Sequence, residues 1–395
     1  MEIFCHMDTR SPPAPSHRRP IPPFTPEHER LRAEIRAFVE TRLRPHAEEW
    51  EQAGWFPNYV FGWLAQAGYL GLKFAPEYGG GGDTVAAAVL VEELARCGSG
   101  GVAAGLGAHA GIALPPIAMF GTEDQRQRYL VPGLRGEKIA ALAITEPGAG
   151  SDVASIRTHA RRVPDGYLVN GAKTFITGGV RADVLVTAVK TKPEGGHHGL
   201  SFLIVEREPG DGITTSPLRK LGWHASDTAE ISFDDVFVPE EGRLGDEHGG
   251  FYLIMANFQW ERLLMALGAV GAMQAVFETT LDHVRERRSD SAGDGDRQAV
   301  RHRLAQVATT IETGRAVTYA ALRRHVAGQD AIREVTIAKL ATQRAAVDTI
   351  DACLAIHGLD APPELERALR DARLGPIGGG TDEIMKEILG RSLGL

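Results

Sequence analysis

The spacing of apolar residues changes twice along the chain. Up to about residue 140, apolar side chains recur every three or four positions, which predicts helices. These helices are expected over Pro26–Leu43, Val60–Ala67, Val85–Cys97 and Ala108–Phe120. The first has typical boundary residues, because Thr25 can cap it, Pro26 suits its first turn and Pro45 follows its end. An N-terminal helical domain is therefore expected.

Beyond Ile144 the pattern becomes that of β-strands. Short runs rich in β-branched and aromatic residues occur at Tyr167–Val169, Val184–Val186, Ser201–Val205 and Ile231–Val238. The pairs Asp165-Gly166 and Asn170-Gly171 predict tight turns between strands. These features indicate a compact β domain.

From Gly250 onward the helical spacing returns. Helices are predicted over Phe251–Arg288, Gln298–Ala327, Ile332–Ile356, Leu365–Ala372 and Thr381–Leu389. The order of elements predicts an α+β protein in four parts. These are a disordered leader over 1–22, an N-terminal helical domain over 23–140, a middle β domain over 141–243 and a C-terminal helical bundle over 244–395.

Composition and charge exclude several classes of protein. The 395 residues carry a net charge of -8, which disfavours a nucleic-acid partner. The cysteines, Cys5, Cys97 and Cys353, are far apart and lack the spacing of a disulfide framework or a metal site, so a reducing cytoplasm is expected. Glu92, Glu93, Lys138 and Glu146 break the most apolar stretches, so no uninterrupted apolar run of the ~20 residues of a membrane span is expected.

Two segments carry candidate chemistry. Residues 144–152, ITEPGAGSD, combine hydroxyls with a Gly-rich turn whose bare backbone can approach a flat or phosphorylated ligand closely. Residues 173–179, KTFITGG, follow a predicted hairpin turn and add an aromatic ring and a hydroxyl suited to a heterocycle. A Pro-Gly turn entering a β domain and the end of a strand explain the same residues equally well.

Both segments resemble the acyl-CoA dehydrogenase family, as do residues 221–228 (LGWHASDT), 370–373 (RDAR) and 377–384 (IGGGTDEI). The resemblance in order and spacing covers residues 24–395. It implies the fold of that family, with an N-terminal helical domain, a middle β-barrel or sandwich and a C-terminal four-helix bundle. It also implies FAD as the cofactor.

The resemblance assigns part of the FAD site to these two segments. The residues concerned are Leu142, Ile144, Thr145, Gly150, Ser151, Phe175, Ile176 and Thr177. Ser151 is also implied to lie near the carrier of the acyl thioester. Phe175 stands where the family usually has Trp, so ring stacking is kept while the indole N–H donor is lost.

The implied reaction removes the α-proton of an acyl thioester and passes the β-hydride to N5 of FAD, so it needs a positioned carboxylate base. One branch of the family carries this base just before the Gly-Thr of the tail, where this chain has Gly379. The isovaleryl and long-chain branch carries it on the first long helix of the last domain, and residues 260–263, WERL, place Glu261 there. Arg262 is then implied to reach the pantetheine carrier.

Helical spacing supports Glu261 independently of the resemblance. Glu261 lies seven residues after Ile254, three after Phe258 and four before Met265, on an apolar helix face. Desolvation on such a face raises the pKa of a carboxyl group toward the range of a general base.

Glu261 and Arg262 also have a purely structural interpretation. Glu261 could be a surface residue paired with Arg262 or Arg285, and Arg262 could be a solvated helix charge.

The tail is implied to polarise the thioester carbonyl. In the family a backbone N–H near the glycines, here Gly379 and Gly380, acts together with a ribityl hydroxyl of FAD. Thr381 and Glu383 resemble the FAD-binding residues that follow. A glycine turn with Thr381 as the cap of the last helix is a structural alternative, and both can hold at once.

In the family a neighbouring subunit completes each FAD through two elements that this chain keeps only in part. The matching residues are Arg287, Gln298 and Gly358, and the departures are Asp290, Ser291, Ala355 and Leu359. An acid near a pyrophosphate repels it, so weak FAD binding and a different partner chain are expected. Alternatively, the arginines between residues 285 and 303 could rebuild a phosphate site, although such a run is more often a solvated helix face.

Three functions remain open. The first is a cytoplasmic, oligomeric dehydrogenase that converts acyl-CoA to 2,3-enoyl-CoA. The second is a dehydrogenase or oxidase acting on a carrier-protein thioester in specialised biosynthesis. The third is a partner subunit of a hetero-oligomeric acyl-CoA dehydrogenase. The electron acceptor is expected to be an electron-transfer flavoprotein or oxygen, the assembly a homo- or hetero-oligomer (dimer or tetramer), and no metal is expected.

Overall fold

The computed structural model describes residues 20–208, 210–287 and 294–395, with the side chains of 294–296 left aside. The predicted leader over 1–22 therefore lies almost wholly outside the described residues, as do Cys5, Arg288, Asp290 and Ser291.

The N-terminal part is helical, as the apolar spacing predicts. Its α-helices are α1 (Pro26–Phe38), α2 (Ala47–Ala53), α3 (Tyr59–Gln66), α4 (Thr84–Leu94), α5 (Gly100–Gly107), α6 (Leu114–Phe120), α7 (Glu123–Gln125) and α8 (Val131–Leu134). Short turns of tighter or wider helix join them: η2 (Val39–Leu43), η3 (Arg44–His46), η4 (Pro76–Tyr78), η5 (Ala108–Ala113) and η6 (Arg126–Leu130). Thr25 caps α1 and exchanges hydrogen bonds with His28, so the predicted start of this helix is confirmed.

The middle part is a single, mostly antiparallel sheet with one branching strand. Its strands are β1 (Ala140–Ala143), β2 (His159–Val163), β3 (Gly166–Ile176), β4 (Val184–Lys190), β5 (Leu200–Glu206), β6 (Ile213–Pro217), β7 (Ala229–Pro239) and β8 (Arg243–Leu244). They are ordered β6-β7-β3-β2-β4-β5-β8, and β1 pairs in parallel with β4. The short helical turns in this part are η7 (Val153–Ser155), η8 (Gly196–Gly199) and η9 (Glu240–Gly242).

The turn predicted at Asn170-Gly171 is wrong. Asp165-Gly166 does turn the chain between β2 and β3, but β3 continues through Asn170 with a shift in its pairing with β7. A side chain at position 171 would overlap Thr158, and Gly171 has φ +143. The Asn170 amide donates to Asp235 across the sheet, 2.9 Å away. The Asn-Gly pair therefore forms a β-bulge, whose local geometry also favours glycine.

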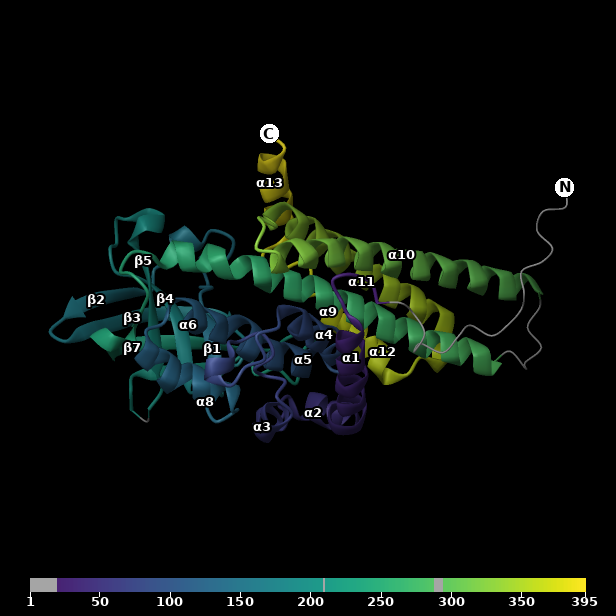
Figure 1. The fold of residues 1–395 in the computed structure, drawn as a ribbon, viewed down its shortest axis with the longest axis horizontal. Coiled ribbons are helices and arrows are strands. Elements are labelled where there is room, and N and C mark those ends of the chain that lie inside the picture. The colour runs from purple at the N-terminus through teal and green to yellow at the C-terminus, as the bar shows by residue number, and fades with distance from the viewer. Residues whose placement is uncertain (1–19, 209, 288–293) are drawn as a thin grey trace.

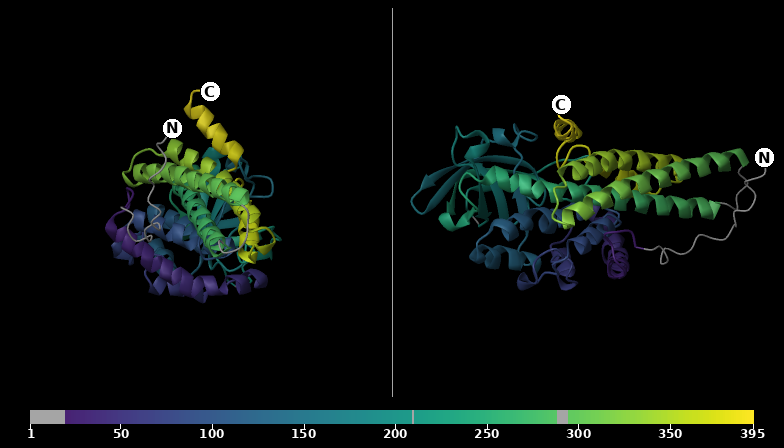
Figure 2. Two further views of the ribbon diagram at one scale, coloured as in Figure 1. Left: turned by 90° about the vertical axis from the view of Figure 1, so that its right-hand side faces the viewer. Right: turned by 45° about the horizontal axis from the view of Figure 1, so that its top comes forward.

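The C-terminal part consists of long helices. They are α9 (Gly250–Glu286), α10 (Asp294–Val326), α11 (Ile332–His357), α12 (Pro363–Ala372) and α13 (Asp382–Ser392), with the turn η11 (Gly358–Asp360) before α12. In Figure 1, α9 runs from beside the sheet to the far end of the bundle, with α10 and α11 along it. The last helix, α13, projects away from the bundle in Figure 1 and in both views of Figure 2.

Helix α9 joins three hydrophobic cores in succession. Its first turns place Ile254 in the core shared with the sheet, Leu263 lies in the N-terminal core and Met273 lies in the core of the bundle. With 37 residues it is about 55 Å long. Two helical stretches, Gly100–Phe120 and Gly250–Glu286, have the length and hydropathy of a membrane span, but 56% of each apolar window is buried inside the protein. We interpret both as core helices.

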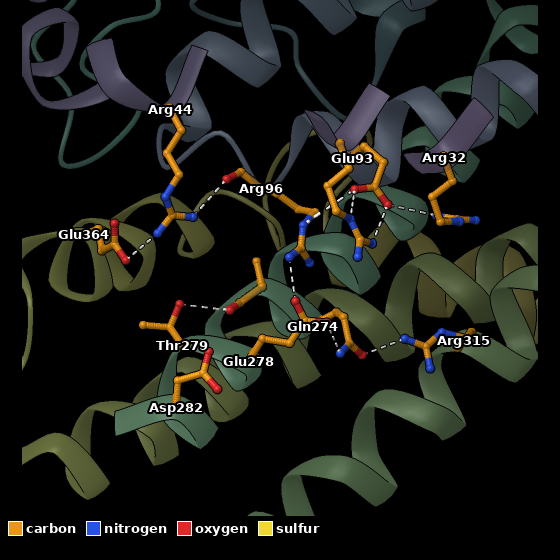
Figure 3. Close-up of polar contacts among 12 residues, drawn as sticks. Arg32, Arg44, Glu93, Arg96, Gln274, Glu278, Thr279, Asp282, Arg315 and Glu364 are labelled. Atoms are coloured by element: carbon orange, nitrogen blue, oxygen red, sulfur yellow. Dashed lines mark hydrogen bonds and ion pairs between the residues drawn. The ribbon is translucent and has the colours of Figure 1, made fainter. Parts of the chain in front are cut away.

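A network of charges ties the N-terminal helices to the bundle (Figure 3). Arg32 of α1 donates to Glu93 of α4 at 3.2 Å, as Figure 3 shows. It also donates to Glu92 of the same helix at 2.6 Å. Arg96, just after α4, reaches Glu278 of α9 at 2.5 Å. Both glutamates of α4 are buried, so their charges need these partners.

All three parts meet at the loop of the middle part that connects β6 and β7. The backbone N–H of Trp223 donates to Asp371 of α12 at 2.6 Å, and the N–H of Gly100 donates to the other oxygen of the same carboxylate at 2.9 Å. Glu51 of α2 accepts from the N–H of His224 at 3.2 Å. A side chain on Gly100 would lie 2.7 Å from both Asp371 and Trp223, so the junction requires glycine there.

Candidate active site

Glu261 and the tail glycines lie together although Glu261 and Gly379 are 118 positions apart in the sequence. A Cβ built on Gly379 would lie 3.8 Å from Glu261 Oε1 and would overlap the sulfur of Met265 one turn further along α9. Gly379 has φ +60, a conformation that glycine adopts at little cost. A side chain at position 379 would therefore displace the sulfur of Met265 and would begin at van der Waals distance from the Glu261 carboxylate.

Glu261 is half-buried as a residue, and its carboxylate oxygen Oε2 is shielded from solvent. This oxygen has no partner among the described residues. Burial raises the pKa of Glu261 to about 7, against the opposing charges of Arg262 and Lys339. Arg285, the distant partner considered from the sequence, pairs instead with Asp282 at 3.0 Å. A surface ion pair therefore does not describe Glu261.

Arg262 is also buried and incompletely satisfied. Its side chain packs with the guanidinium carbon 5.2 Å from the centre of the Phe258 ring, and its Nε has no partner in the described ranges. A Cβ on Gly380 would lie 3.8 Å from one of its terminal nitrogens. Because a buried donor left unpaired is costly, this position is suited to a ligand that accepts hydrogen bonds.

Lys339 of α11 completes this group and was not found from the sequence. Its side chain is fully buried, and its Nζ donates to the carbonyl of Gly380. Burial lowers the pKa of Lys339 to about 8. A single lysine in a helix gives no signal in the sequence, since the contact joins residues 41 positions apart.

The two Gly-rich segments of the middle part lie side by side. The Thr174 N–H donates to the Thr145 carbonyl at 2.8 Å. Beneath them Lys173 and Glu146 form a buried ion pair at 2.8 Å, and Lys173 also donates to the Ile144 carbonyl at 3.0 Å. Glu146 further accepts from the backbone N–H of Arg157 at 2.6 Å. This buried pair holds both segments in fixed positions.

Phe175 presents an open aromatic face at this edge. It is 68% exposed and has φ +59, an unusual backbone conformation for a bulky residue. Such strain is concentrated at functional sites, and an exposed ring held in this way suits stacking on a planar ligand. Thr177, two residues on, is half-buried, and its hydroxyl forms no hydrogen bond with the described residues.

The remaining residues assigned to the FAD differ in accessibility. Gly150 and Ser151 are exposed, Leu142 and Thr145 are half-buried, and Ile176 is buried in the sheet, so its side chain faces away from solvent. Ile144 is buried in the same core as Ile254 of α9, two helical turns before Glu261. Helix α9 therefore links this edge of the sheet to the group around Glu261.

The tail residues lie at the start of α13. Thr381 caps this helix by accepting from the Ile384 N–H at 3.3 Å, so the structural reading of Thr381 is confirmed. Glu383 is exposed in the first turn. The cap leaves the backbone at Gly379 and Gly380 outside the helix, next to Glu261 and Arg262.

The residues expected to complete a neighbour's FAD lie at the far end of the bundle. Arg287 forms an ion pair with Asp360 at 2.9 Å, which brings the end of α9 to the Gly358 turn. Gln298 is exposed on α10, and Leu359 is fully exposed. The structure thus places two of the three matching residues, Arg287 and Gly358, near each other. It also places an acid there, Asp360, which the sequence pattern did not indicate.

Comparison with known proteins identifies the family. Models of the acyl-CoA dehydrogenase N-terminal, middle and C-terminal domains match residues 25–137, 141–236 and 248–394. Over 378 residues the chain is 35% identical to the long-chain specific acyl-CoA dehydrogenase of Rattus norvegicus, covering 94% of this chain and 87% of the relative. The isovaleryl-CoA dehydrogenase of Solanum tuberosum is also 35% identical, with 94% and 91% covered.

Solved structures show the same fold. A putative acyl-CoA dehydrogenase from Mycobacterium smegmatis superposes with a TM-score of 0.89 at 41% identity, covering 94% of this chain and 98% of that one. The FAD complex of PigA has a TM-score of 0.89 at 28% identity and the prolyl acyl carrier protein oxidase AnaB 0.87 at 28%, each over 94% of this chain and 98% and 100% of the other.

The fold and the matched domains define a flavin-dependent oxidoreductase that acts on a CH–CH bond and uses FAD. The chain belongs to the acyl-CoA dehydrogenase family. The residues of the middle part fit FAD, because the open face of Phe175 and the unpaired hydroxyl of Thr177 stand where a planar, hydrogen-bonding ring could be received.

Proposed function

We propose that this protein catalyses the α,β-dehydrogenation of an acyl thioester with Glu261 as the base that removes the α-proton. The observation that carries the proposal is the position of the Glu261 carboxylate, buried beside the backbone of Gly379 with one oxygen unpaired. A pKa of about 7 leaves a large fraction of this carboxyl ionised near neutral pH.

The surrounding residues have complementary roles in this proposal. The thioester carbonyl accepts from the backbone at Gly379 and Gly380, which makes the α-proton acidic. Arg262, with its unpaired Nε, binds the pantetheine carrier, near Ser151. Bound FAD supplies the acceptor for the hydride that leaves the β-carbon.

We assign the binding of FAD to three sets of residues. The ring end is held by Leu142, Ile144, Thr145, Gly150, Ser151, Phe175, Ile176 and Thr177 of the same chain. Thr381 and Glu383 add contacts from the tail, and Arg287, Gln298 and Gly358 serve the FAD of a neighbouring subunit. Ile176 contributes through its backbone, because its side chain is buried in the sheet.

Acyl-CoA is the first substrate to test, and a carrier-protein thioester is the second. The relatives of this chain include enzymes named for long-chain and isovaleryl CoA esters. The similarity to the prolyl acyl carrier protein oxidase AnaB supports the second candidate. Both thioesters carry the same pantetheine arm, which is the part that Arg262 and Ser151 would contact.

Association with other chains is part of the proposal. The projecting helix α13 and the position of the C-terminal end of α9, at the end of the bundle far from the sheet, both favour an oligomer. An electron-transfer flavoprotein or oxygen is proposed as the electron acceptor.

A cytoplasmic location is proposed because Cys97 and Cys353 are free, buried thiols. A non-catalytic partner subunit remains the weaker function, since Glu261 is retained.

Anaerobic titration tests the proposal. The purified protein, saturated with FAD, is mixed with acyl-CoA esters of several chain lengths and with acyl carrier thioesters, and bleaching of the FAD absorbance is followed. We expect bleaching by at least one thioester and formation of its 2,3-enoyl product. Glu261→Gln should bind FAD normally and bleach at least roughly 10² to 10⁴-fold more slowly. A Gln variant as fast as the parent would refute Glu261 as the base.

A further inference from the structure

Lys339 occupies an unusual environment for a lysine. Its side chain is fully buried, yet it forms no ion pair within the described residues, and its Nζ donates to the carbonyl of Gly380. Burying an ammonium group costs free energy unless strong interactions compensate for it. A neutral residue of the same length would avoid that cost, so the charge at this position calls for an explanation.

The hydrogen bond from Lys339 holds one end of the glycine turn. The other end is held by the Gly378 N–H, which donates to the Leu374 carbonyl at 2.9 Å. Between these anchors Gly379 and Gly380 have φ +60 and +93, and a glycine backbone is otherwise the most flexible in a protein. Since a peptide unit is planar, fixing the Gly380 carbonyl also fixes the peptide that leads into Thr381 and α13.

Lys339 also contributes charge to the site. The ammonium group of Lys339 interacts electrostatically with Glu261 and Arg262 of α9. It also interacts with Asp382 and Glu383 of α13. Of these groups, Lys339 and Arg262 lower the pKa of Glu261, while burial raises it. Removing the positive charge of Lys339 should therefore raise the pKa of Glu261 further.

We propose that Lys339 is a positioning residue of the active site, whose ammonium group holds the Gly379–Gly380 turn against Glu261. This inference rests on the proposed function, because the turn matters for catalysis only if Glu261 is the base. It assigns a role to a residue of α11 that contacts the turn and not the substrate.

Two variants of Lys339 test its hydrogen bond and its charge, with a control at Lys220 and a reserve variant. Lys339→Met removes both, and Lys339→Arg keeps the charge with a different donor geometry. Lys220→Met is the matched control, because Lys220 also donates to a carbonyl, that of Ser226 at 2.9 Å, away from Glu261. Lys339→Gln, neutral and polar, replaces the Met variant if that protein does not fold.

Two measurements decide the question. The first is backbone hydrogen exchange of the peptide around residues 378–381, which does not depend on FAD or turnover. We expect faster exchange in Lys339→Met and an unchanged rate in Lys220→Met. Exchange that stays at the parent's rate in a folded Lys339→Met protein would overturn the proposal.

The second measurement is the pH profile of kcat and KM with the best substrate. Lys339→Met should lower kcat roughly 10 to 100-fold with a smaller change in KM, and should move the ascending midpoint of kcat to higher pH. Lys339→Arg should keep the parent's midpoint. A parental kcat and midpoint in Lys339→Met would overturn the role of Lys339 alone, whereas full activity of Glu261→Gln would overturn the proposed function.

Discussion

The Glu261 carboxylate lies 3.8 Å from the point where a side chain on Gly379 would begin. Two positions that are distant in sequence therefore converge on one place in the structure. By the resemblance noted above, these are the two positions at which branches of the family carry the catalytic base. In this chain only one of them bears a carboxylate, and the other is a glycine.

The rate of the reductive reaction should rise with pH through about 7. Burial raises the pKa of Glu261 to about 7, and only the ionised carboxylate can accept the α-proton. Stopped-flow bleaching of FAD between pH 5 and 9 should give this midpoint for the parent. A profile that is flat down to pH 5 would mean that the group limiting the rate is not a buried carboxyl.

Gly379→Ala should impair both stability and catalysis. The added methyl group overlaps the sulfur of Met265, and the left-handed backbone alone costs about 1–2 kcal/mol for a residue with a Cβ. Gly328→Ala is the control, because Gly328 has φ +67 and nothing within 4 Å of the added atom. Both variants should lose stability in thermal unfolding, and only Gly379→Ala should also lose kcat. If Gly379→Ala and Gly328→Ala lost stability and kcat equally, the contact with Met265 would have no role.

Thr177→Val should weaken the retention of FAD or shift its absorbance spectrum. The substitution removes a hydroxyl at nearly constant volume, and a lost hydrogen bond costs about 0.5–1.5 kcal/mol, which is roughly a 2- to 12-fold change in Kd. Thr214→Val, an exposed threonine on β6, is the control. The FAD affinity of each variant can be measured by fluorescence titration. An unchanged affinity and spectrum in Thr177→Val would argue against the placement of the ring.

The protein produced alone should hold FAD weakly or below one per chain. The guanidinium of Arg287, expected to serve a neighbour's FAD, is already paired with Asp360 at 2.9 Å. Asp360→Asn should free it and increase the FAD retained after gel filtration. Asp282→Asn, which breaks the neighbouring pair with Arg285, should have no such effect. One tightly bound FAD per chain in a homo-oligomer of the parent would remove the need for a different partner.

Asp371 should make the protein less stable as pH rises. Burial raises the pKa of Asp371 to about 6. The negative charge of Glu51 adds to this rise, and the positive charge of Arg367 opposes it. A raised pKa means that the folded state binds the proton more tightly. This tighter proton binding stabilises the folded state by on the order of 3 kcal/mol. The stabilisation is fully present below about pH 4 and is lost as the pH rises through about 6.

Asp371→Asn should flatten this dependence while lowering stability at every pH, because one of the two backbone donors, Trp223 or Gly100, loses its acceptor. Thermal unfolding between pH 4.5 and 8 measures both effects. Asp348→Asn, an exposed residue of α11, serves as the control. The assignment fails if the parent and Asp371→Asn show the same slope of stability with pH.

Much of the fold follows from local sequence. Apolar spacing and capping residues such as Thr25 located the helices, because a helix buries one face and its first N–H groups need acceptors. The helix carrying Glu261 and its apolar face could be found in the same way. The Asn170-Gly171 pair shows the limit, since the same two residues suit a turn or a bulge, and the pairing of β3 with β7 decides between them.

The tertiary structure alone decided which distant residues act together. No periodicity links Lys339 to Gly380, Asp360 to Arg287 or Asp371 to Trp223, because these contacts depend on how separate helices and loops pack. The sequence by itself determined the residue types, their local structure and the family resemblance. The burial that shifts the pKa of Glu261, and the bare backbone of Gly379 beside it, exist only once α9, α11 and the tail have come together, since desolvation is a property of the packed interior.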